Sequence, residues 1–207
     1  MTELDYRIIS SGSKGNAVRI GNVMVDCGVP FKNMKDDLYT CKYLLLTHIH
    51  SDHIRPTTLK KIKELFPRIT IIGNYEVHQH FGLDIICNAG YEVKKNTDIF
   101  LPFEAIHDVL CYGYTWEDNG NSIIYCTDTA SLINAPIAEK YDYLFLESNH
   151  DERKLEQIKD AQKKYGYDVV AGASRHLSTQ TCKAFYYMNR RGKESKLIEL
   201  HKSERFY

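Results

Sequence analysis

The sequence predicts a mixed α/β protein with at least two β-sheets. Many short runs of β-branched, aromatic and other apolar residues are typical of strands, and a few segments with helical periodicity lie between them. The chain has 207 residues, of which 43% are hydrophobic and 26% are charged. That length and composition are typical of one folded domain with a well-buried core. We therefore expect residues 1–207 to form a single domain of the α/β class.

The first part of the chain alternates strands with helices. Strands are expected at four early runs, residues 6–10, 17–20, 23–25 and 43–47. Pro56 then begins a helical pattern over residues 57–66, because proline is tolerated in the first turn of a helix. A strand at 68–73 and a short helix at 75–82 are expected to follow.

The second part is richer in strands and contains two late helices. Further strands are expected at residues 85–87, 91–93, 103–106, 110–116, 122–126, 143–147 and 196–200. The helices are expected at 151–165 and 178–191. Ser148 and Asp151 have the spacing of a capping box, which would satisfy free backbone N–H groups at the start of the first helix.

Cysteine usage and the lack of long apolar runs indicate a cytoplasmic protein. The six cysteines are scattered without a C-x-x-C pair, and most lie in apolar segments, which favours buried reduced thiols. No apolar run approaches the roughly 18–20 residues that cross a bilayer. The opening MTELDYRIIS also lacks the pattern of a secretory signal. We expect no membrane association, and the sequence does not indicate an oligomeric state.

The formal net charge is zero, with 27 basic and 27 acidic side chains. This balance argues against binding of nucleic acid through bulk positive charge, but it does not exclude a local basic patch. Residues 1–150 carry 14 basic and 19 acidic side chains, a net of −5, whereas residues 151–207 carry 13 and 8, a net of +5. The neutrality is thus the sum of two oppositely charged parts.

The most informative segment is THIHSDH, residues 47–53, directly after an apolar strand. Alternate residues of an extended chain share a face, so His48 and His50 can bind one metal ion together. Asp52 and His53 lie beyond the bend and can reach a second ion. Imidazole nitrogens with a carboxylate suit zinc, and also manganese or iron. The segment therefore predicts a site for two divalent metal ions.

The H-x-H-x-D-H pattern resembles the signature of the metallo-β-lactamase-fold hydrolases, and the resemblance extends over nearly the whole chain. It implies a four-layer αββα sandwich, in which two mixed β-sheets pack face to face with helices outside. It also implies that His107 completes the first metal site, that Asp128 bridges both ions and that His176 binds the second. Asp26 resembles an aspartate of the family that supports the ligand loop from behind the metals.

Within this superfamily the sequence most resembles the WalJ/YycJ group of bacterial proteins, which the resemblance associates with nuclease or phosphodiesterase activity. The shared stretches are SSGSKGNA, VDCG, HIHSDH, TDTA, LESNHD and RHLS. Two positions depart from the group, since Ala130 and Arg175 stand where glycine is usual. These departures bear on the expected substrate and not on the expected metal site.

The resemblance implies hydrolysis by an activated water. Two cations bridged by a carboxylate lower the pKa of a shared water toward neutrality, which yields hydroxide as the nucleophile. Asp52 would bind metal and orient this nucleophile, and His150 would donate a proton to the leaving oxygen. The other interpretation of His150 is a polar side chain exposed at a helix start.

Four further residues are candidates for binding a nucleic acid or nucleotide substrate. Asn149 would orient the substrate, and Arg175 would clamp a phosphate beside the metals. Ser13 and Lys14 belong to a loop that either contacts phosphate or only forms a turn.

Three aromatic residues follow His107 with alternating spacing, namely Tyr112, Tyr114 and Trp116. They either stack against bases or form the core face of a strand. The leading functional hypothesis is a dinuclear phosphodiesterase, in particular a DNA or RNA nuclease. The alternatives are a small-molecule hydrolase of the same fold, such as a cyclic-nucleotide phosphodiesterase or thioesterase, and a non-catalytic binding protein with a vestigial metal site.

Overall fold

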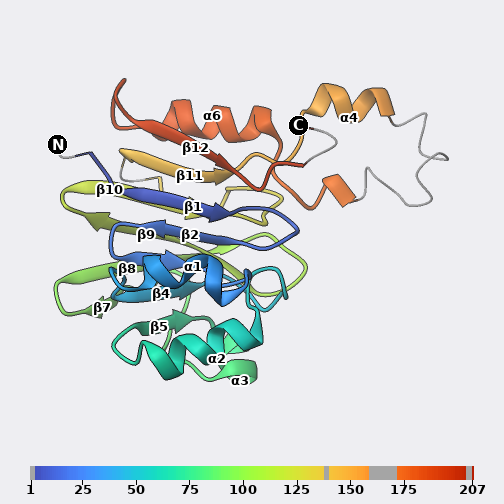
Figure 1. Ribbon diagram of the computed structural model, residues 1–207. Coiled ribbons are helices and arrows are strands. Elements are labelled where there is room, and N and C mark those ends of the chain that lie inside the picture. Colours follow the sequence, from blue (N-terminus) through green and yellow to red (C-terminus); the bar gives the residue numbers. More distant parts are fainter. Residues whose placement is uncertain (1–2, 138–139, 159–171, 204–206) are drawn as a thin grey trace.

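Figure 1 shows the computed structural model of the protein, which describes residues 3–137, 140–158, 172–203 and 207. Two β-sheets of six strands each form its centre. The first sheet contains, in spatial order, β1 (Tyr6–Ser10), β2 (Ala17–Ile20), β3 (Val23–Val25), β4 (Tyr43–Leu46), β5 (Thr70–Gly73) and β6 (Ile85–Ile86). The second contains β12 (Lys196–Leu200), β11 (Tyr143–Glu147), β10 (Asn121–Cys126), β9 (Cys111–Asp118), β8 (Asp98–Ala105) and β7 (Val93–Lys95).

Both sheets are mixed, as the sequence predicts. In the first sheet β1, β2 and β3 pair antiparallel, and the strands from β3 to β6 pair parallel. In the second sheet the strands from β7 to β10 pair antiparallel, and β10, β11 and β12 pair parallel. The predicted α/β class is therefore confirmed.

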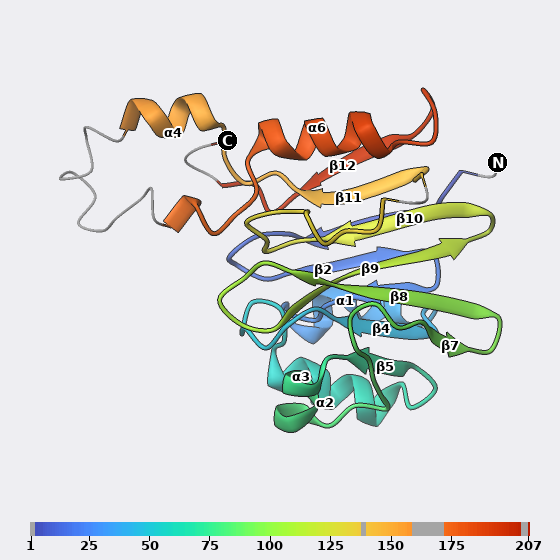
Figure 2. The same ribbon diagram turned by 180° about the vertical axis from the view of Figure 1, so that it is seen from behind.

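Three apolar clusters separate four layers. The central cluster lies between the sheets, where Val25 and Leu45 of the first sheet belong to the same cluster as Ile123 and Phe145 of the second. The second cluster joins the outer face of the first sheet to α1 (Phe31–Leu38), α2 (Pro56–Leu65) and α3 (Tyr75–Phe81). The third joins the outer face of the second sheet to α6 (Thr179–Asn189), which runs beside β11 and β12 in Figures 1 and 2. The arrangement is an αββα sandwich.

Helix α1 is a helix that the sequence pattern did not predict. Most of its residues are polar, and its apolar face consists of Phe31, Met34 and Leu38, of which Met34 and Leu38 are buried and Phe31 is partly buried. Three apolar positions in eight residues are only a short helical pattern. The helix is stabilised because these side chains pack on the outer face of the first sheet.

The start of α4 (Glu152–Ile158) differs in detail from the predicted capping box. Asp151 is itself the cap, since its Oδ1 accepts hydrogen bonds from the N–H groups of Arg153 at 2.9 Å and Lys154 at 3.1 Å. The Ser148 hydroxyl instead lies 3.0 Å from Thr179 Oγ1, away from this helix. The rest of the predicted helix, residues 159–165, lies outside the described residues.

The aromatic residues of β9 belong to the core. Tyr112, Tyr114 and Trp116 are 7%, 0% and 5% exposed and lie in the cluster between the sheets. Successive residues of a strand point to opposite faces, so this spacing places all three on the inner face. The core interpretation is confirmed, and these rings are not available to stack against bases. The six cysteine side chains are also buried. In the described part of the chain, no helix is long and apolar enough to cross a membrane.

The fold makes a direct prediction for Leu45, which is fully buried between the sheets. Leu45→Ala should lower the free energy of unfolding by about 2–5 kcal/mol, because it removes apolar contacts and leaves a cavity. Leu65→Ala is the matched control, since Leu65 is 60% exposed on α2 and should cost less than about 1 kcal/mol. Urea unfolding of the two variants and the unsubstituted protein measures this, and equal losses would contradict the assigned core.

Candidate metal centre

The candidate site lies where strands of both sheets end. β3 and β4 run parallel in the first sheet, and β8, β10, β11 and β12 share one direction in the second. Strands that run the same way bring their carboxyl ends to one edge of a sheet. Each of these six strands is followed at that edge by a residue of the site or ends in one. Segments far apart in the sequence are thereby brought together.

Three of these strands are followed by residues with left-handed backbone conformations. Asp26, Asp128 and His201 have φ values of 61°, 54° and 52°. Such values are uncommon outside glycine, although aspartate and histidine adopt them more readily than other residues. Strained backbone of this kind clusters at functional sites, because the surrounding structure must hold it in place. Here it turns each side chain abruptly out of the strand direction.

The loop after β4 carries the H-x-H-x-D-H motif and is fixed by its backbone. The carbonyl of His50 accepts hydrogen bonds from the N–H groups of His53 at 3.0 Å and Ile54 at 2.8 Å, which closes a turn around Asp52. The backbone of Gly28 packs against this turn. A Cβ atom at Gly28 would lie 1.7 Å from the carbonyl oxygen of Asp52, so only glycine allows the approach.

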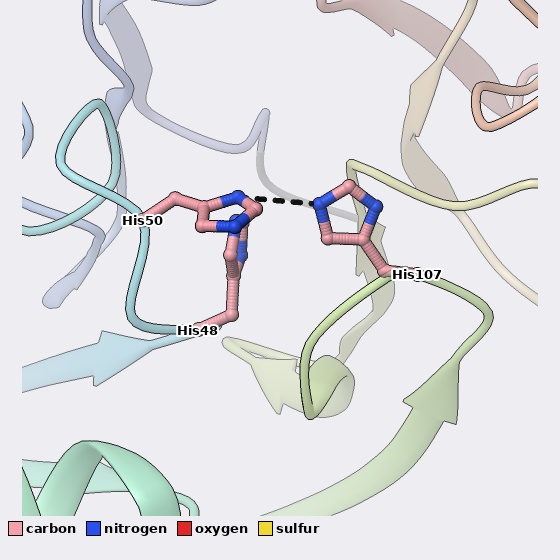
Figure 3. A group of neighbouring side chains, drawn as sticks. All are labelled: His48, His50 and His107. Carbon is pink, nitrogen blue, oxygen red and sulfur yellow. Dashed lines mark hydrogen bonds between the residues drawn. The ribbon is translucent and has the colours of Figure 1, made fainter. Parts of the chain in front are cut away.

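The first cluster consists of His48, His50 and His107. Each contributes one nitrogen, and these atoms lie within 4.8 Å of one another. Figure 3 shows the rings converging, two from the loop after β4 and one from the loop after β8. His107 Nε2 and His50 Nδ1 are 3.4 Å apart, the spacing of about 3.4 Å expected between two ligands of a tetrahedral ion at about 2.0–2.1 Å.

The second cluster consists of Asp52, His53 and His201, again within 4.8 Å. Asp128 lies beside it, with Oδ2 2.9 Å from His53 Nε2 and Oδ1 3.5 Å from His201 Nε2. Asp128 also lies within 4.8 Å of both His48 and His53, one from each cluster. Its buried carboxylate therefore stands between the two clusters, where the sequence predicts a bridging ligand.

Several buried atoms of these residues make no hydrogen bond. Among the described residues, His48 Nε2, His201 Nε2 and Asp128 Oδ2 are buried without a hydrogen-bond partner. A buried polar atom without a partner is destabilising and calls for an explanation such as an ion. Because all three atoms are lone-pair donors facing their clusters, the residues fit a pair of divalent cations in both donor chemistry and spacing.

The histidines differ in how readily they take up a proton. Burial lowers the pKa of His48, and the nearby charge of His53 lowers it further. For His53 burial acts in the same direction, but the carboxylates of Asp128 and Asp26 outweigh it and raise the pKa well above the ordinary value. Metal ligands must be deprotonated, so metal binding at His53 would release a proton.

Asp26 lies where the sequence places it, behind the ligand loop. It is fully buried, and its Oδ2 accepts a hydrogen bond from His53 Nδ1 at 2.7 Å. The proton on Nδ1 leaves Nε2 as the lone-pair nitrogen, directed at the second cluster. Asp26 thus determines which nitrogen of His53 is available to a metal.

The structure brings a second histidine, His201, to the second cluster. His201, which the sequence pattern gave no role, lies with Asp52 and His53, and the predicted ligand His176 lies in an overlapping group with Asp128, Glu147 and His201 whose ligand atoms are also within 4.8 Å of one another. His176 Nδ1 is 2.7 Å from Glu147 Oε1 and 4.0 Å from Asp128 Oδ1, and its ring stacks on that of His201 at 5.2 Å. His176 therefore lies beside His201 and the carboxylates of Glu147 and Asp128.

Glu147, at the end of β11, is a buried carboxylate at the candidate site that the sequence pattern did not single out. It is fully buried, and Oε1 lies 2.7 Å from His176 Nδ1 and 3.1 Å from His201 Nδ1. Its Oε2 accepts hydrogen bonds from the backbone N–H groups of Thr129 and Leu177. Burial raises the pKa of Glu147, but the hydrogen bonds from the two histidines outweigh this and hold it below the ordinary value. Glu147 orients both rings as a carboxylate.

The predicted substrate residues fall into two groups. Ser13, Lys14 and Arg175 are exposed near the strand ends, and Arg175 pairs with Asp108 at 3.3 Å. Asn149 instead faces inward, and its Nδ2 donates to the carbonyl of His201 at 2.9 Å. The Ser13 loop also contacts the second cluster, because Ser11 Oγ accepts a hydrogen bond from the His201 N–H and Asn16 Nδ2 lies 2.8 Å from His53 Nε2.

His150, the predicted proton donor, is buried rather than exposed. His150 is 5% exposed, and its Nδ1 has no hydrogen-bond partner among the described residues. Burial holds the pKa of His150 below the ordinary value of histidine. The ring is therefore mainly neutral at pH 7, which disfavours it as a proton donor relative to a histidine paired with a carboxylate.

Comparisons with known proteins identify the fold. No protein-family model matches the sequence. No curated protein matches it either. Among solved structures, the metallo-beta-lactamase fold protein YhfI from Bacillus subtilis superposes with a TM-score of 0.70 at 15% identity, covering 96% of this chain and 86% of its own.

Two other solved structures are similar over almost the whole chain. The short form of human tRNase Z has a TM-score of 0.67 at 16% identity, covering 97% of this chain and 93% of its own. A diphosphatase from the PhnP family has a TM-score of 0.68 at 16% identity, covering 97% and 87%. The finer resemblance to the WalJ/YycJ group stays a prediction. At these identities the likeness shows the architecture, and this chain has the metallo-β-lactamase fold.

Proposed function

We propose that this protein is a dinuclear metal-dependent hydrolase of phosphodiester bonds, with DNA or RNA as its substrate. The observation that carries the proposal is the pair of clusters joined by Asp128, with buried lone-pair atoms that have no hydrogen-bond partner among the described residues. When bound, two divalent cations supply Lewis-acid charge and activate water as a nucleophile. Zinc, manganese and iron all suit the donor set.

Seven residues would hold the ions. His48, His50 and His107 hold the first, and Asp52, His53 and His201 hold the second. Asp128 contributes to both. This assignment replaces His176 with His201 as the last ligand, because Nε2 of His201 is buried without a hydrogen bond to any described residue while Nδ1 lies 3.1 Å from Glu147 Oε1. Asp52 also orients the nucleophile, since its side chain is the more exposed carboxylate of the cluster.

The same geometry supports a different role for His176. Its side chain is 23% exposed, and its Nδ1–H donates to Glu147. Burial disfavours the charged ring, but the hydrogen bond that the ring donates to Glu147 outweighs burial and raises the pKa of His176. His176 is therefore the better placed donor of a proton to the leaving oxygen, with His150 as the alternative.

Charge around the site supports an anionic substrate. Arg175 is exposed and pairs with Asp108, which lies 3.1 Å from His107 Nε2, and two bound cations would add four positive charges to the edge that carries the aspartates. The solved structures with this fold include a tRNase Z and a diphosphatase by name. Those names favour phosphate esters and anhydrides over thioesters as the class to test first.

Asp128→Asn tests the shared carboxylate. The variant should retain fewer than two ions per chain and lose more than about 100-fold in phosphodiesterase activity. Loss of a residue that only orients a metal ligand typically costs about 10–100-fold, and loss of a ligand should cost more. Elemental analysis gives the metal content. Activity is measured on 5′-phosphorylated DNA, RNA, a cyclic nucleotide, a pyrophosphate, a generic phosphodiester and a thioester. Asp36→Asn, an exposed change on α1, is the control.

Two results would contradict the proposal in different ways. Full activity in Asp128→Asn would remove this residue from the mechanism. Well under one ion per chain in the unsubstituted protein would exclude a dinuclear enzyme. Faster turnover of the thioester or the cyclic nucleotide than of either polymer would instead select the small-molecule alternative.

The proton donor is tested with two leaving groups. His176→Gln should lose about 10²–10⁴-fold on a nucleic-acid diester, whose leaving oxygen needs a proton. The loss should be much smaller on bis(p-nitrophenyl) phosphate, whose leaving group departs as a stable anion. His150→Gln is the matched comparison and should show no such dependence on the leaving group. The reverse pattern would restore His150 as the donor.

A further inference from the structure

The hydroxyl of Thr47 lies at the point where the supports of the two clusters meet. Thr47 is fully buried, directly before His48. Its Oγ1 is 3.0 Å from His48 Nδ1, 3.1 Å and 3.0 Å from the two carboxylate oxygens of Asp26, and 3.2 Å from His53 Nδ1. One hydroxyl therefore contacts a ligand residue of each cluster and the carboxylate behind them.

The donors and acceptors in this group can be paired in one consistent way. A hydroxyl has one proton to donate and two lone pairs that accept, whereas an ionised carboxylate only accepts. The Thr47 O–H donates to Asp26, the carboxylate within reach. His53 Nδ1–H donates to Asp26 Oδ2 at 2.7 Å, its shorter contact. The lone pairs of Thr47 Oγ1 are then free to accept from His48 Nδ1–H.

That pairing determines the tautomer of His48. With its proton on Nδ1, His48 presents Nε2 as a lone pair, and Nε2 is the buried atom that makes no hydrogen bond among the described residues. The other close contact of Nδ1 is Cys111 Sγ at 3.5 Å, and a thiol sulfur is a weak acceptor. The Thr47 hydroxyl is thus the strong acceptor for this proton.

The backbone of Thr47 is held independently of its hydroxyl. Its N–H donates to Asp26 Oδ1 at 2.9 Å, and its carbonyl accepts from the Tyr112 N–H at 3.0 Å and from Asn74 Nδ2 at 3.2 Å. Removing the hydroxyl alone should therefore leave the loop in place. The hydroxyl and the backbone have separable functions.

We propose that Thr47 is a positioning residue that links Asp26 to the first cluster. Its hydroxyl donates to Asp26 and accepts from His48 Nδ1–H, which fixes the His48 tautomer whose Nε2 has a lone pair for the metal. The inference rests on the proposed metal sites. His53 contacts Asp26 directly, whereas His48 reaches it through Thr47. Loss of the hydroxyl should consequently weaken the first metal site more than the second.

Thr47→Val tests this, because valine matches the shape of threonine and lacks the hydroxyl. The first ion should bind about 10–100-fold more weakly, the range for removal of a group that orients a metal ligand. The second ion should bind almost as in the unsubstituted protein. Thr47→Ser keeps the hydroxyl and should restore the first affinity. Zinc titration against a competing chelator measures both affinities.

A second readout uses the metal-free protein. Nitrogen-15 NMR of the histidine rings should find the His48 proton on Nδ1 in the unsubstituted protein and in Thr47→Ser. Thr47→Val should shift the population toward the Nε2-protonated tautomer. Thermal unfolding of the metal-free forms confirms that each variant is folded.

The inference is overturned if Thr47→Val keeps the His48 tautomer and binds both ions with unchanged affinity. It is also overturned if both sites weaken equally, which would indicate general loosening of the loop. The outcome is distinct from failure of the proposed function, since a protein that binds two ions but hydrolyses no phosphodiester still reports the tautomer and both affinities.

Discussion

The structure depends on the buried carboxylate of Asp128, which stands between two clusters of ligating side chains. It is 3% exposed, and its Oδ2 pairs with His53 Nε2 at 2.9 Å. Burying a charge is costly unless opposite charge or hydrogen bonds compensate. The charge of His53 provides part of that compensation, and bound divalent cations would add to it. The candidate ligands of both clusters lie at the carboxyl ends of strands. Left-handed turns follow three of the strands at this edge, and buried carboxylates orient the histidine rings.

Two further buried carboxylates keep the histidines in usable orientations. Asp26 holds His53 in the first sheet, and Glu147 holds His201 in the second. In each case the carboxylate accepts a hydrogen bond from one protonated ring nitrogen, so the other nitrogen keeps a lone pair toward its cluster. Thr47 extends the first support to His48, and Glu147 extends the second to His176. Each sheet thus contributes one buried carboxylate that orients histidines of the candidate centre.

The sequence predicted the fold class, and the contiguous residues of the first loop allowed most of the candidate ligands to be named from the sequence. His107 and Asp128 were found through their order after that motif. His201 and Glu147 were missed for physical reasons. A single histidine after a strand and a glutamate at the end of YLFLE carry no periodic signal, and only the meeting of β11 and β12 at one edge gives them a role. His176 and His201 both contact Glu147 in the structure. The sequence does not show which of the two lies with Asp52 and His53.

The most direct test is a crystal structure of the metal-loaded protein with anomalous diffraction at the metal edge. The account predicts two peaks, one beside His48, His50 and His107 and one beside Asp52, His53 and His201, with Asp128 in contact with both. A single peak, or a second ion bound by His176 with His201 turned away, would contradict it.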